Sequence, residues 1–284
     1  MFILTHRGLD PSRVGYFPES TIEAFLDHLT RGFGLEFDLQ MTKDKKIVVS
    51  HDDNLSRISG GTDSRLISEL GLSEIGGLEI GGCRLSSLRE LLVIIDKYSD
   101  ERLSAVHVKS EFQKKDFLDI LLDDIDHIDP TKFIFFDLKP ESADYLKSKN
   151  KLIQLAASVS HPYDIKRFNR YVGGTLISLD DIINYNNLFD WAWLDEWDRT
   201  DEIGSKSMYN SQNFSLLRDH GFKIALVTPE LHRNSPGLLA KECHQDAGDI
   251  DKLFSRVGQI LKFEPEAICT DYPDRLQSMV KELK

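Results

Sequence analysis

Two carboxylates within a short apolar run are the first residues in this sequence that could do chemistry. Glu36 and Asp38 alternate with apolar residues, and alternate side chains of a β-strand point to the same face. Adjacent carboxylates repel each other unless a proton or a cation lies between them, and a hard divalent cation prefers oxygen ligands of this kind. Because the flanking residues are apolar, the pattern favours a cation site over a solvated polar strand face.

The motif His6-Arg7-Gly8 follows directly on the apolar residues with which the sequence begins. A histidine can transfer protons near neutral pH, an arginine presents a planar fork that fits phosphate oxygens, and a glycine lets backbone or ligand approach closely. Three specified residues match a chain of this length by chance on the order of a few per cent of the time. Alone, the motif is therefore compatible with a phosphate site or with a solvated turn.

His51 follows another apolar run, which is too close to the strand of Glu36 for a crossover helix. The intervening Met41–Lys46 predicts a hairpin turn. One possible register pairs Asp38 with Val49, and it places His51 opposite Glu36. A shift of two residues places His51 opposite Asp38, whereas a shift of one turns it to the other face. Two of these three registers bring an imidazole beside the acids, and a surface histidine is the alternative.

Short apolar runs rich in β-branched and aromatic residues predict the strands, and segments of helical periodicity separate most of them. The predicted strands are Phe2–Thr5, Leu35–Leu39, Ile47–Ser50, Leu103–Lys109, Phe133–Asp137, Leu152–Ala156, Asp190–Asp195, Lys223–Val227 and Ala267–Thr270. Without the return strand of the hairpin, eight strands remain in a chain of 284 residues. They predict an α/β fold, a TIM (β/α)8 barrel whose mouth gathers polar residues from the strand ends. A doubly wound open sheet is the alternative.

Capping residues predict where two of the helices begin. Ser20 and Glu23 form a predicted capping box, and Ser87 forms a second one with a glutamate three residues later. Gly221 is expected to end a helix just before a strand. Further helices are expected at Phe112–Leu122, Phe214–Asp219, Ile250–Leu261 and Asp274–Lys284.

The segment Asp53–Cys83 differs from the rest because it is rich in glycine and has only a short helical pattern. It predicts a small insertion after the second barrel strand, at one end of the barrel, so that residues 1–284 form a single domain. Pro229–Gly248 is a second long connection.

Composition limits the classes of partner that the chain is expected to bind. The formal net charge of −12 argues against binding to nucleic acid or to an anionic membrane surface. No apolar run is long enough for a transmembrane helix, and the first residues are expected to form a strand and not the apolar core of a signal peptide. The three cysteines, Cys83, Cys243 and Cys269, are widely spaced and predict reduced thiols in a cytoplasmic protein. The oligomeric state is not predicted.

The motifs, in their order and spacing, resemble those of the glycerophosphodiester phosphodiesterase family from the first strand to the last. They are His6-Arg7-Gly8, Pro18-Glu19-Ser20-Thr21, Glu36-Phe37-Asp38-Leu39, Thr42-Lys43-Asp44, His51-Asp52 and Thr270-Asp271-Tyr272-Pro273. The resemblance implies a barrel related to the phosphatidylinositol phospholipases C, a place in lipid metabolism, and an insertion that caps the substrate.

The resemblance also implies an activity and residue roles. The expected reaction is hydrolysis of a small glycerophosphodiester to an alcohol and glycerol 3-phosphate, and a cyclic phosphate is a possible intermediate. His6 and His51 would be general acid and base, and Arg7 would bind the phosphate. Glu36 and Asp38 would hold one divalent cation, calcium or magnesium.

One departure from the family concerns the third barrel strand, where the family has a glutamate ligand two residues before a lysine. This chain has His107 in that place and keeps Lys109, which could neutralise phosphate. An imidazole suits a transition metal better than calcium. His107 is therefore a candidate ligand of such a metal, or it only packs beside a two-carboxylate site. Alternatively, Asp195 or Glu196 supplies the missing charge.

A second departure lies at the seventh barrel strand, where the family often has tryptophan and threonine and this chain has Val227-Thr228. Loss of a tryptophan removes an apolar wall, which Trp193 or Trp197 could replace, although core packing is the expected role of Trp193. The alcohol of the substrate could then differ from glycerol. His232 and His244 are expected in a solvated loop.

Two other functions stay open at this point. One is a metal-independent phosphodiester lyase of the phospholipase C type, which would use both histidines and Arg7. The other is a non-catalytic barrel that binds a phosphorylated headgroup or a sugar.

Overall fold

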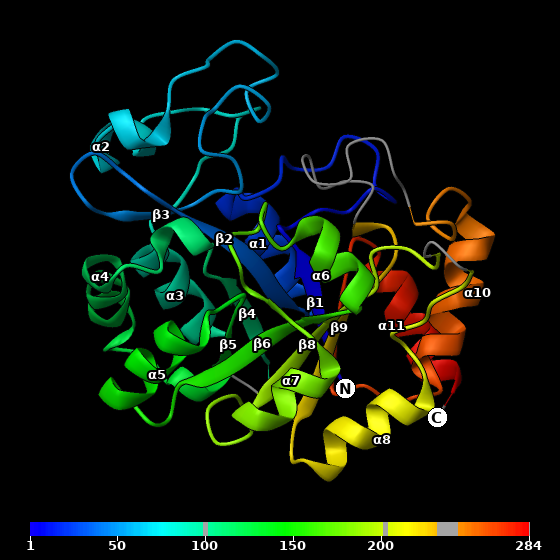
Figure 1. The fold of residues 1–284 in the computed structure, drawn as a ribbon. Helices are drawn as coiled ribbons and strands as arrows, with labels where there is room; N and C mark the ends of the chain where they lie inside the picture. The colour runs from blue at the N-terminus through cyan, green and yellow to red at the C-terminus, as the bar shows by residue number, and fades with distance from the viewer. Residues whose placement is uncertain (99–101, 201–203, 232–243, 284) are drawn as a thin grey trace.

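Ten strands form one sheet, and without β3 and β7 eight of them close into a parallel barrel (Figure 1). The computed structural model describes residues 1–98, 102–200, 204–231 and 244–283. The barrel closes because β1 pairs with both β2 and β10, which confirms the TIM barrel and rules out the open sheet. In barrel order the strands are β1 Phe2–His6, β2 Gly34–Met41, β4 Ser104–His107, β5 Phe133–Phe136, β6 Gln154–Ser160, β8 Trp191–Asp195, β9 Lys223–Val227 and β10 Ala267–Thr270.

Two short strands extend the sheet outside the barrel. β3, Ile47–Val49, runs antiparallel to the end of β2, as the predicted hairpin requires. β7, Leu176–Ile177, pairs with β6. The sequence did not predict β7, because a strand of two residues is too short to show an alternating pattern. Every strand that the sequence predicted overlaps an observed one.

Helices follow most of the barrel strands and cover their outer faces (Figure 1). They are α1 Ile22–Thr30, α2 Leu72–Gly76, α3 Leu88–Lys97, α4 Lys115–Ile125, α5 Pro140–Lys149, α6 Pro162–Phe168, α7 Leu179–Ile182, α8 Ser211–Asp219, α10 Ile250–Leu261 and α11 Pro273–Glu282, with 3₁₀ turns at Ile67–Glu69, Ser110–Phe112, Pro130–Lys132 and Ile183–Tyr185. None of the helices in the described residues has the length and apolar character that crossing a membrane requires.

Of the two predicted capping boxes, the one at α3 is half present and the one at α1 is wrong. Ser87 accepts a hydrogen bond from the Glu90 amide at 3.1 Å, but the Glu90 carboxylate binds Arg84 instead of closing a capping box. At α1 the cap is Thr21, whose hydroxyl faces the amide three residues later. Ser20 cannot cap α1 because its φ of 60° lies in the left-handed region, whereas an N-cap is extended.

The alternation of β2 decides which side chains enter the barrel. Leu35, Phe37 and Leu39 pack in the large apolar core between the strands and the helices. Successive side chains of a strand point to opposite faces, so Glu36 and Asp38 must point into the barrel. A smaller apolar core, which includes Leu4, Ala105, Ile134, Trp193 and Ala225, fills the barrel interior.

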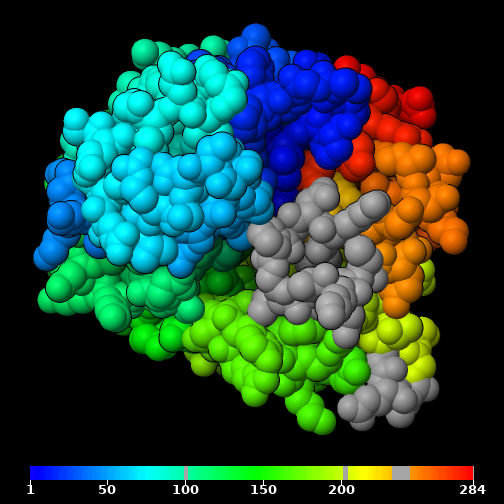
Figure 2. Space-filling view, turned by 90° about the horizontal axis from the view of Figure 1, so that it is seen from above, coloured from blue at the N-terminus to red at the C-terminus, as the bar shows by residue number. Residues whose placement is uncertain are grey.

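The glycine-rich segment stands at the carboxyl end of the barrel (Figure 1). Its apolar side chains form a small cluster of their own, including Leu55, Ile67, Leu70 and Ile75. Figure 2, which looks onto this end, shows the segment in cyan covering one side. The structure therefore places it at the end where β2 delivers its acids.

Close strand packing makes Gly34 a sensitive position. A Cβ atom there would lie 1.8 Å from the backbone oxygen of Leu103 and 2.9 Å from Leu4 Cδ2. Since the backbone oxygen belongs to a neighbouring barrel segment, Gly34→Ala should lower the free energy of unfolding by about 3 kcal/mol or more. Gly76→Ala is the control, because its Cβ would meet nothing within 4 Å. Urea unfolding measures both, and equal stability of the two variants would contradict the predicted clash.

Candidate active site

A cavity of about 890 Å³ opens at the carboxyl end of the barrel. Six of the seven predicted site residues line it, while Asp38 is fully buried beneath them. The six are His6, Arg7, Glu36, His51, His107 and Lys109. The opposite part of the lining is largely apolar and includes Phe136, Phe168, Leu176, Trp193 and Trp197. Residues from distant parts of the sequence therefore meet at one mouth, as the barrel predicts.

His6 ends β1 and is held by a carboxylate from the last strand. Its Nδ1 donates to Asp271 Oδ1 at 2.9 Å, and both side chains are buried. Barrel closure makes this contact possible, because β10 delivers Asp271 next to β1. With Nδ1 bound, Nε2 is the ring nitrogen that can serve a ligand in the cavity.

Arg7 and Gly8 form a tight turn above β1. Arg7 has a φ of 53°, which is uncommon for a residue other than glycine. Gly8, with a φ of 73°, brings the chain so close to α1 that a Cβ would lie 3.0 Å from Ala24 Cβ. This backbone directs Arg7 inward, where its Nε lies 3.1 Å from Asp38 Oδ2. The turn thus delivers a buried guanidinium to the acids.

Glu36, Asp38 and His107 form a candidate cation site. One ligand atom from each lies within 4.8 Å of the others. Burial and the neighbouring Asp38 raise the pKa of Glu36. Its Oε2 is buried and accepts no hydrogen bond from any residue in the described ranges. A buried carboxylate oxygen left in this condition is costly, and a bound cation would satisfy it.

His107 bridges two carboxylates. Its Nδ1 lies 2.7 Å from Asp38 Oδ1, and its Nε2 lies 3.1 Å from Asp137 Oδ2. Burial by itself lowers the pKa of His107, but the hydrogen bonds to Asp137 and Asp38 outweigh burial and raise the pKa to about 10. In this arrangement both ring nitrogens donate.

Asp38 is surrounded by basic side chains. Burial raises its pKa, but Lys109, His51 and Arg7 outweigh burial and hold the pKa well below the usual range. Lys109 Nζ lies 3.7 Å from Asp38 Oδ1 and also donates to the backbone oxygen of His51. Lys109 therefore connects the acids to the hairpin.

His51 reaches the cavity by a route that the register argument did not foresee. The hairpin pairs Leu39 with Val49, one residue away from the pairing of Asp38 with Val49. This is the shift of one residue that turns a strand residue at position 51 away from the acids, so neither of the two favourable registers is formed. However, β3 ends at Val49 and the chain bends from His51 onward. The bend, and not strand alternation, brings the imidazole to the cavity.

A chain of ion pairs holds His51. Its Nδ1 donates to Asp52 Oδ1 at 2.6 Å, and Arg57 Nε donates to Asp52 Oδ2 at 2.6 Å. Arg57 also makes two hydrogen bonds to Glu19, of 2.8 and 2.7 Å. Burial lowers the pKa of His51. His51 and His6 therefore share one geometry, in which a carboxylate holds Nδ1.

Sequence analysis assigned no role to Asp137, Asp271 or Asp52, although all three bind a predicted site histidine. Asp137 and Asp271 directly follow barrel strands, which is where site residues of this fold concentrate. Their position at the ends of predicted barrel strands could therefore have marked them as site residues. Asp137 also has a φ of 64°, which the sequence does not reveal.

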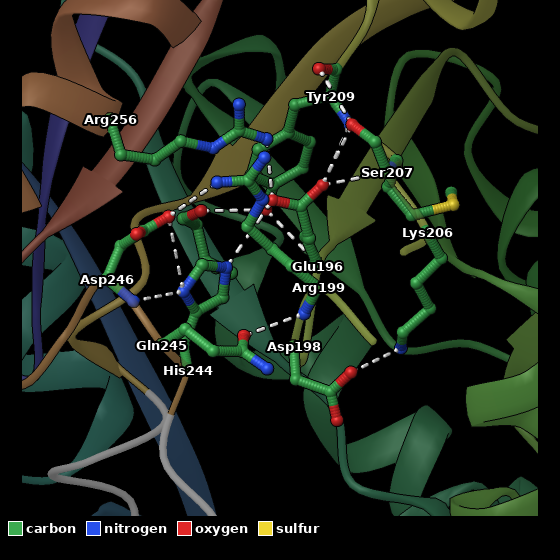
Figure 3. A network of polar contacts seen from close by, with 12 residues as sticks. Glu196, Asp198, Arg199, Lys206, Ser207, Tyr209, His244, Gln245, Asp246 and Arg256 are labelled. Carbon is green, nitrogen blue, oxygen red and sulfur yellow. Dashed lines mark hydrogen bonds and ion pairs between the residues drawn. The ribbon is translucent and has the colours of Figure 1, made fainter. Parts of the chain in front are cut away.

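Glu196 does not supply charge to the cation site. Figure 3 shows it within a separate polar network, where its Oε1 accepts from Arg256 at 2.6 Å and its Oε2 accepts from the Met208 amide at 2.8 Å. His244 belongs to the same network, 3.4 Å from Glu196, and is buried, so the expected solvated loop histidine is wrong. Asp195 lines the cavity but does not join the cation cluster. His232 and Cys243 lie outside the described residues.

Both tryptophans near the end of β8 line the cavity. Trp193 is buried, as core packing requires, and stacks on Phe136 with 4.1 Å between ring centroids. Trp197 stacks on Phe168 at 4.8 Å. The aromatic wall is therefore present, and its tryptophans come from the sixth barrel strand and the residues after it.

Known proteins resemble this chain in sequence and in fold. The Bacillus subtilis protein YhdW, provisionally named a glycerophosphodiester phosphodiesterase, is 44% identical over 63 residues, which are 22% of this chain and 24% of that protein. A provisionally named glycerophosphodiester phosphodiesterase from Galdieria sulphuraria superposes with a TM-score of 0.70 at 18% identity, over 99% of this chain and 97% of that chain. A phosphodiesterase from Oleispira antarctica, solved with its product sn-glycerol-3-phosphate, gives a TM-score of 0.66 at 17% identity, over 99% and 97%.

Structural likeness at such identities establishes the fold alone, and the aligned YhdW segment spans about a quarter of that relative. The family match covers far more of the chain. The sequence profile of the glycerophosphoryl diester phosphodiesterase family matches residues 6–275. The chain therefore belongs to the glycerophosphoryl diester phosphodiesterase family, a family of phosphoric diester hydrolases.

Proposed function

We propose that this protein hydrolyses a glycerophosphodiester to an alcohol and glycerol 3-phosphate, with His6 and His51 as its acid and base. The observation that carries the proposal is the pair of carboxylate-held imidazoles at one cavity. A base and an acid on the two sides of a phosphorus atom are what an in-line displacement needs. The product sn-glycerol-3-phosphate found with the Oleispira antarctica phosphodiesterase supports this choice of substrate.

The proposed reaction adds one water to the diester. One imidazole accepts a proton from the attacking water, and the other donates a proton to the alcohol oxygen as its bond to phosphorus breaks. Asp271 and Asp52 hold the two rings in the required tautomer, since each binds Nδ1. Arg7 and Lys109, both at the cavity, would oppose the negative charge of the phosphate oxygens in the transition state.

Glu36, Asp38 and His107 would hold one divalent cation. The site fits such an ion because its ligand atoms converge and because the buried Glu36 Oε2 accepts no hydrogen bond from the described part of the chain. When bound, a cation there would act as a Lewis acid on the phosphate oxygens.

The identity of the cation depends on His107. Calcium and magnesium prefer oxygen ligands, whereas an imidazole suits first-row transition ions. A metal-binding histidine usually donates its other N–H to a carboxylate, and Asp137 is in position to accept from Nε2 at 3.1 Å. We therefore favour a transition ion, and calcium or magnesium on the two carboxylates is the alternative.

Two other functions make different predictions. A metal-independent lyase of the phospholipase C type would keep full activity after exhaustive chelation. A non-catalytic phosphate- or sugar-binding barrel would bind glycerophosphodiesters without cleaving any of them. A substrate panel assayed with calcium, magnesium, manganese, zinc or chelator separates both from the proposed hydrolase.

Replacing either imidazole should stop turnover. His6→Ala and His51→Ala should each lower kcat on the order of 10²-fold or more, with unfolding free energies that show a folded barrel. His127→Ala is the control, because His127 is an exposed histidine in a turn. Activity of His6→Ala or His51→Ala within about tenfold of the unaltered protein, roughly 1.4 kcal/mol of barrier, would contradict the roles of these residues.

The metal content tests the role of His107. Protein purified without chelators or added metals should carry a transition ion, and His107→Ala should lose it. Asp137→Asn should weaken its binding by about 10–100-fold, and asparagine tolerates the left-handed backbone of position 137. Elemental analysis and metal titration give both results without an activity assay. Calcium as the sole metal, still retained by His107→Ala, would remove the ligand role.

A further inference from the structure

The cavity extends well beyond the candidate catalytic groups. In the ring of eight strands, β6 and β8 lie across the barrel from β1 and β2. In the segments that follow β6 and β8 in the chain, Phe168, Leu176 and Trp197 form a separate buried apolar cluster, with Val172 packed against it. All four also line the cavity. The mouth thus has a polar half that carries acids and imidazoles and an apolar half that faces it.

An aromatic surface connects the two halves. The His107 ring stacks on Phe136 with centroids 4.8 Å apart and planes 15° apart. Phe136 stacks in turn on Trp193, with centroids 4.1 Å apart and planes 10° apart. A substituent that extends from a phosphate bound beside His107 would therefore contact apolar ring atoms.

Buried polar contacts on both sides of Trp197 fix the apolar wall. Before it, Glu196 is held by Arg256 and by two backbone amides (Figure 3). After it, Asp198 lies 3.0 Å from Lys206 Nζ, a contact also drawn in Figure 3. The indole itself donates from Nε1 to Ser160 Oγ at 3.1 Å. Since these contacts hold the ring in place, the wall exists before any ligand binds.

The charge balance in the apolar half argues against an anionic ligand group there. Arg167 lines the cavity, but it pairs with Asp198 at 3.1 Å and its guanidinium lies 4.5 Å from the centre of the Phe168 ring. Because Asp198 already balances its charge, Arg167 is a weak attractor for a second anion. A neutral apolar group needs no counter-charge and matches the apolar rings that line this half of the cavity.

We propose that this half of the cavity binds an alkyl or acyl chain carried by the glycerol of the diester, so that the preferred substrate is of the lysophospholipid class. This inference rests on the proposed function. In the reaction, water adds its oxygen to phosphorus, the P–O bond to the head-group alcohol breaks, and that alcohol leaves with a proton. The chain stays on the phosphomonoester product. A cavity of about 890 Å³ is near the upper end of ligand pockets, larger than a short polar alcohol needs.

The test compares substrates that differ only in chain length. 1-O-alkyl-glycero-3-phosphoethanolamines with methyl, butyl and octyl chains are used below the concentrations at which they form micelles. The ratio of kcat/KM for octyl to that for methyl should be at least tenfold, which is well below the gain from fully burying about seven methylene groups.

Variants of the wall should reduce this ratio. Trp197→Ala and Phe168→Ala should bring it toward one, and Tyr145→Ala, which removes an aromatic ring from the outer helix α5, should leave it unchanged. The ratio is taken within each variant, so a general loss of activity cancels.

Three outcomes would overturn the chain-binding subsite. They are equal hydrolysis of methyl and octyl substrates, a ratio that survives both wall substitutions, and a tenfold preference for choline over ethanolamine at equal chain length. Calorimetric binding of octyl- and methyl-glycerol 3-phosphate repeats the comparison without turnover. If no diester is cleaved, the proposed hydrolysis fails, while tighter binding of the octyl compound would still support the subsite and equal binding would overturn it.

Discussion

The buried pair of carboxylates inside the barrel is the constraint on which the rest of the site depends. Removing ions from water costs several kcal/mol each, so Glu36 and Asp38 can be ionised only if positive groups come with them. Asp38 has them, since His107 lies at 2.7 Å, Arg7 at 3.1 Å and Lys109 at 3.7 Å. The buried Glu36 Oε2 accepts no hydrogen bond from the described residues, and burial beside Asp38 raises the pKa of Glu36. The two acids are therefore inequivalent, and Glu36 is the one whose charged form a cation would stabilise most.

Barrel closure explains why this constraint can be met from so many parts of the chain. β1 lies between the second and the last barrel strands, so His6 adjoins Glu36 on one side and Asp271 on the other. The insertion contributes from outside, where Arg57 joins Asp52 to Glu19. Each imidazole is thus held by a carboxylate that belongs to another element or to the bend after β3.

Features that follow from residues close together in the sequence could be predicted. Features that depend on contacts between distant segments could not. The apolar positions 35, 37 and 39 fixed the inward direction of Glu36 and Asp38, and eight strands with helices between them gave the barrel. The hairpin register could not be predicted, because it depends on the turn type as well as on the loop length. His51 reaches the site through a bend after Val49, which no periodicity encodes. The role of Asp137 could be recognised only in the structure, because its partner His107 comes from another strand.

The two departures from the family, at the third and at the seventh barrel strands, meet in one physical feature. A glutamate in place of His107 could ligate a cation, but its carboxylate could not stack on an aromatic ring. The imidazole does, and Phe136 and Trp193 continue the stack toward the apolar half of the cavity. Loss of the tryptophan at the seventh strand is matched by Phe136 on the fourth barrel strand, by Trp193 on the sixth, and by Phe168 and Trp197 after the fifth and the sixth. The change of ligand thus begins an aromatic stack that ends at Trp193, and Trp197 and Phe168 form a second stacked pair that lines the same cavity.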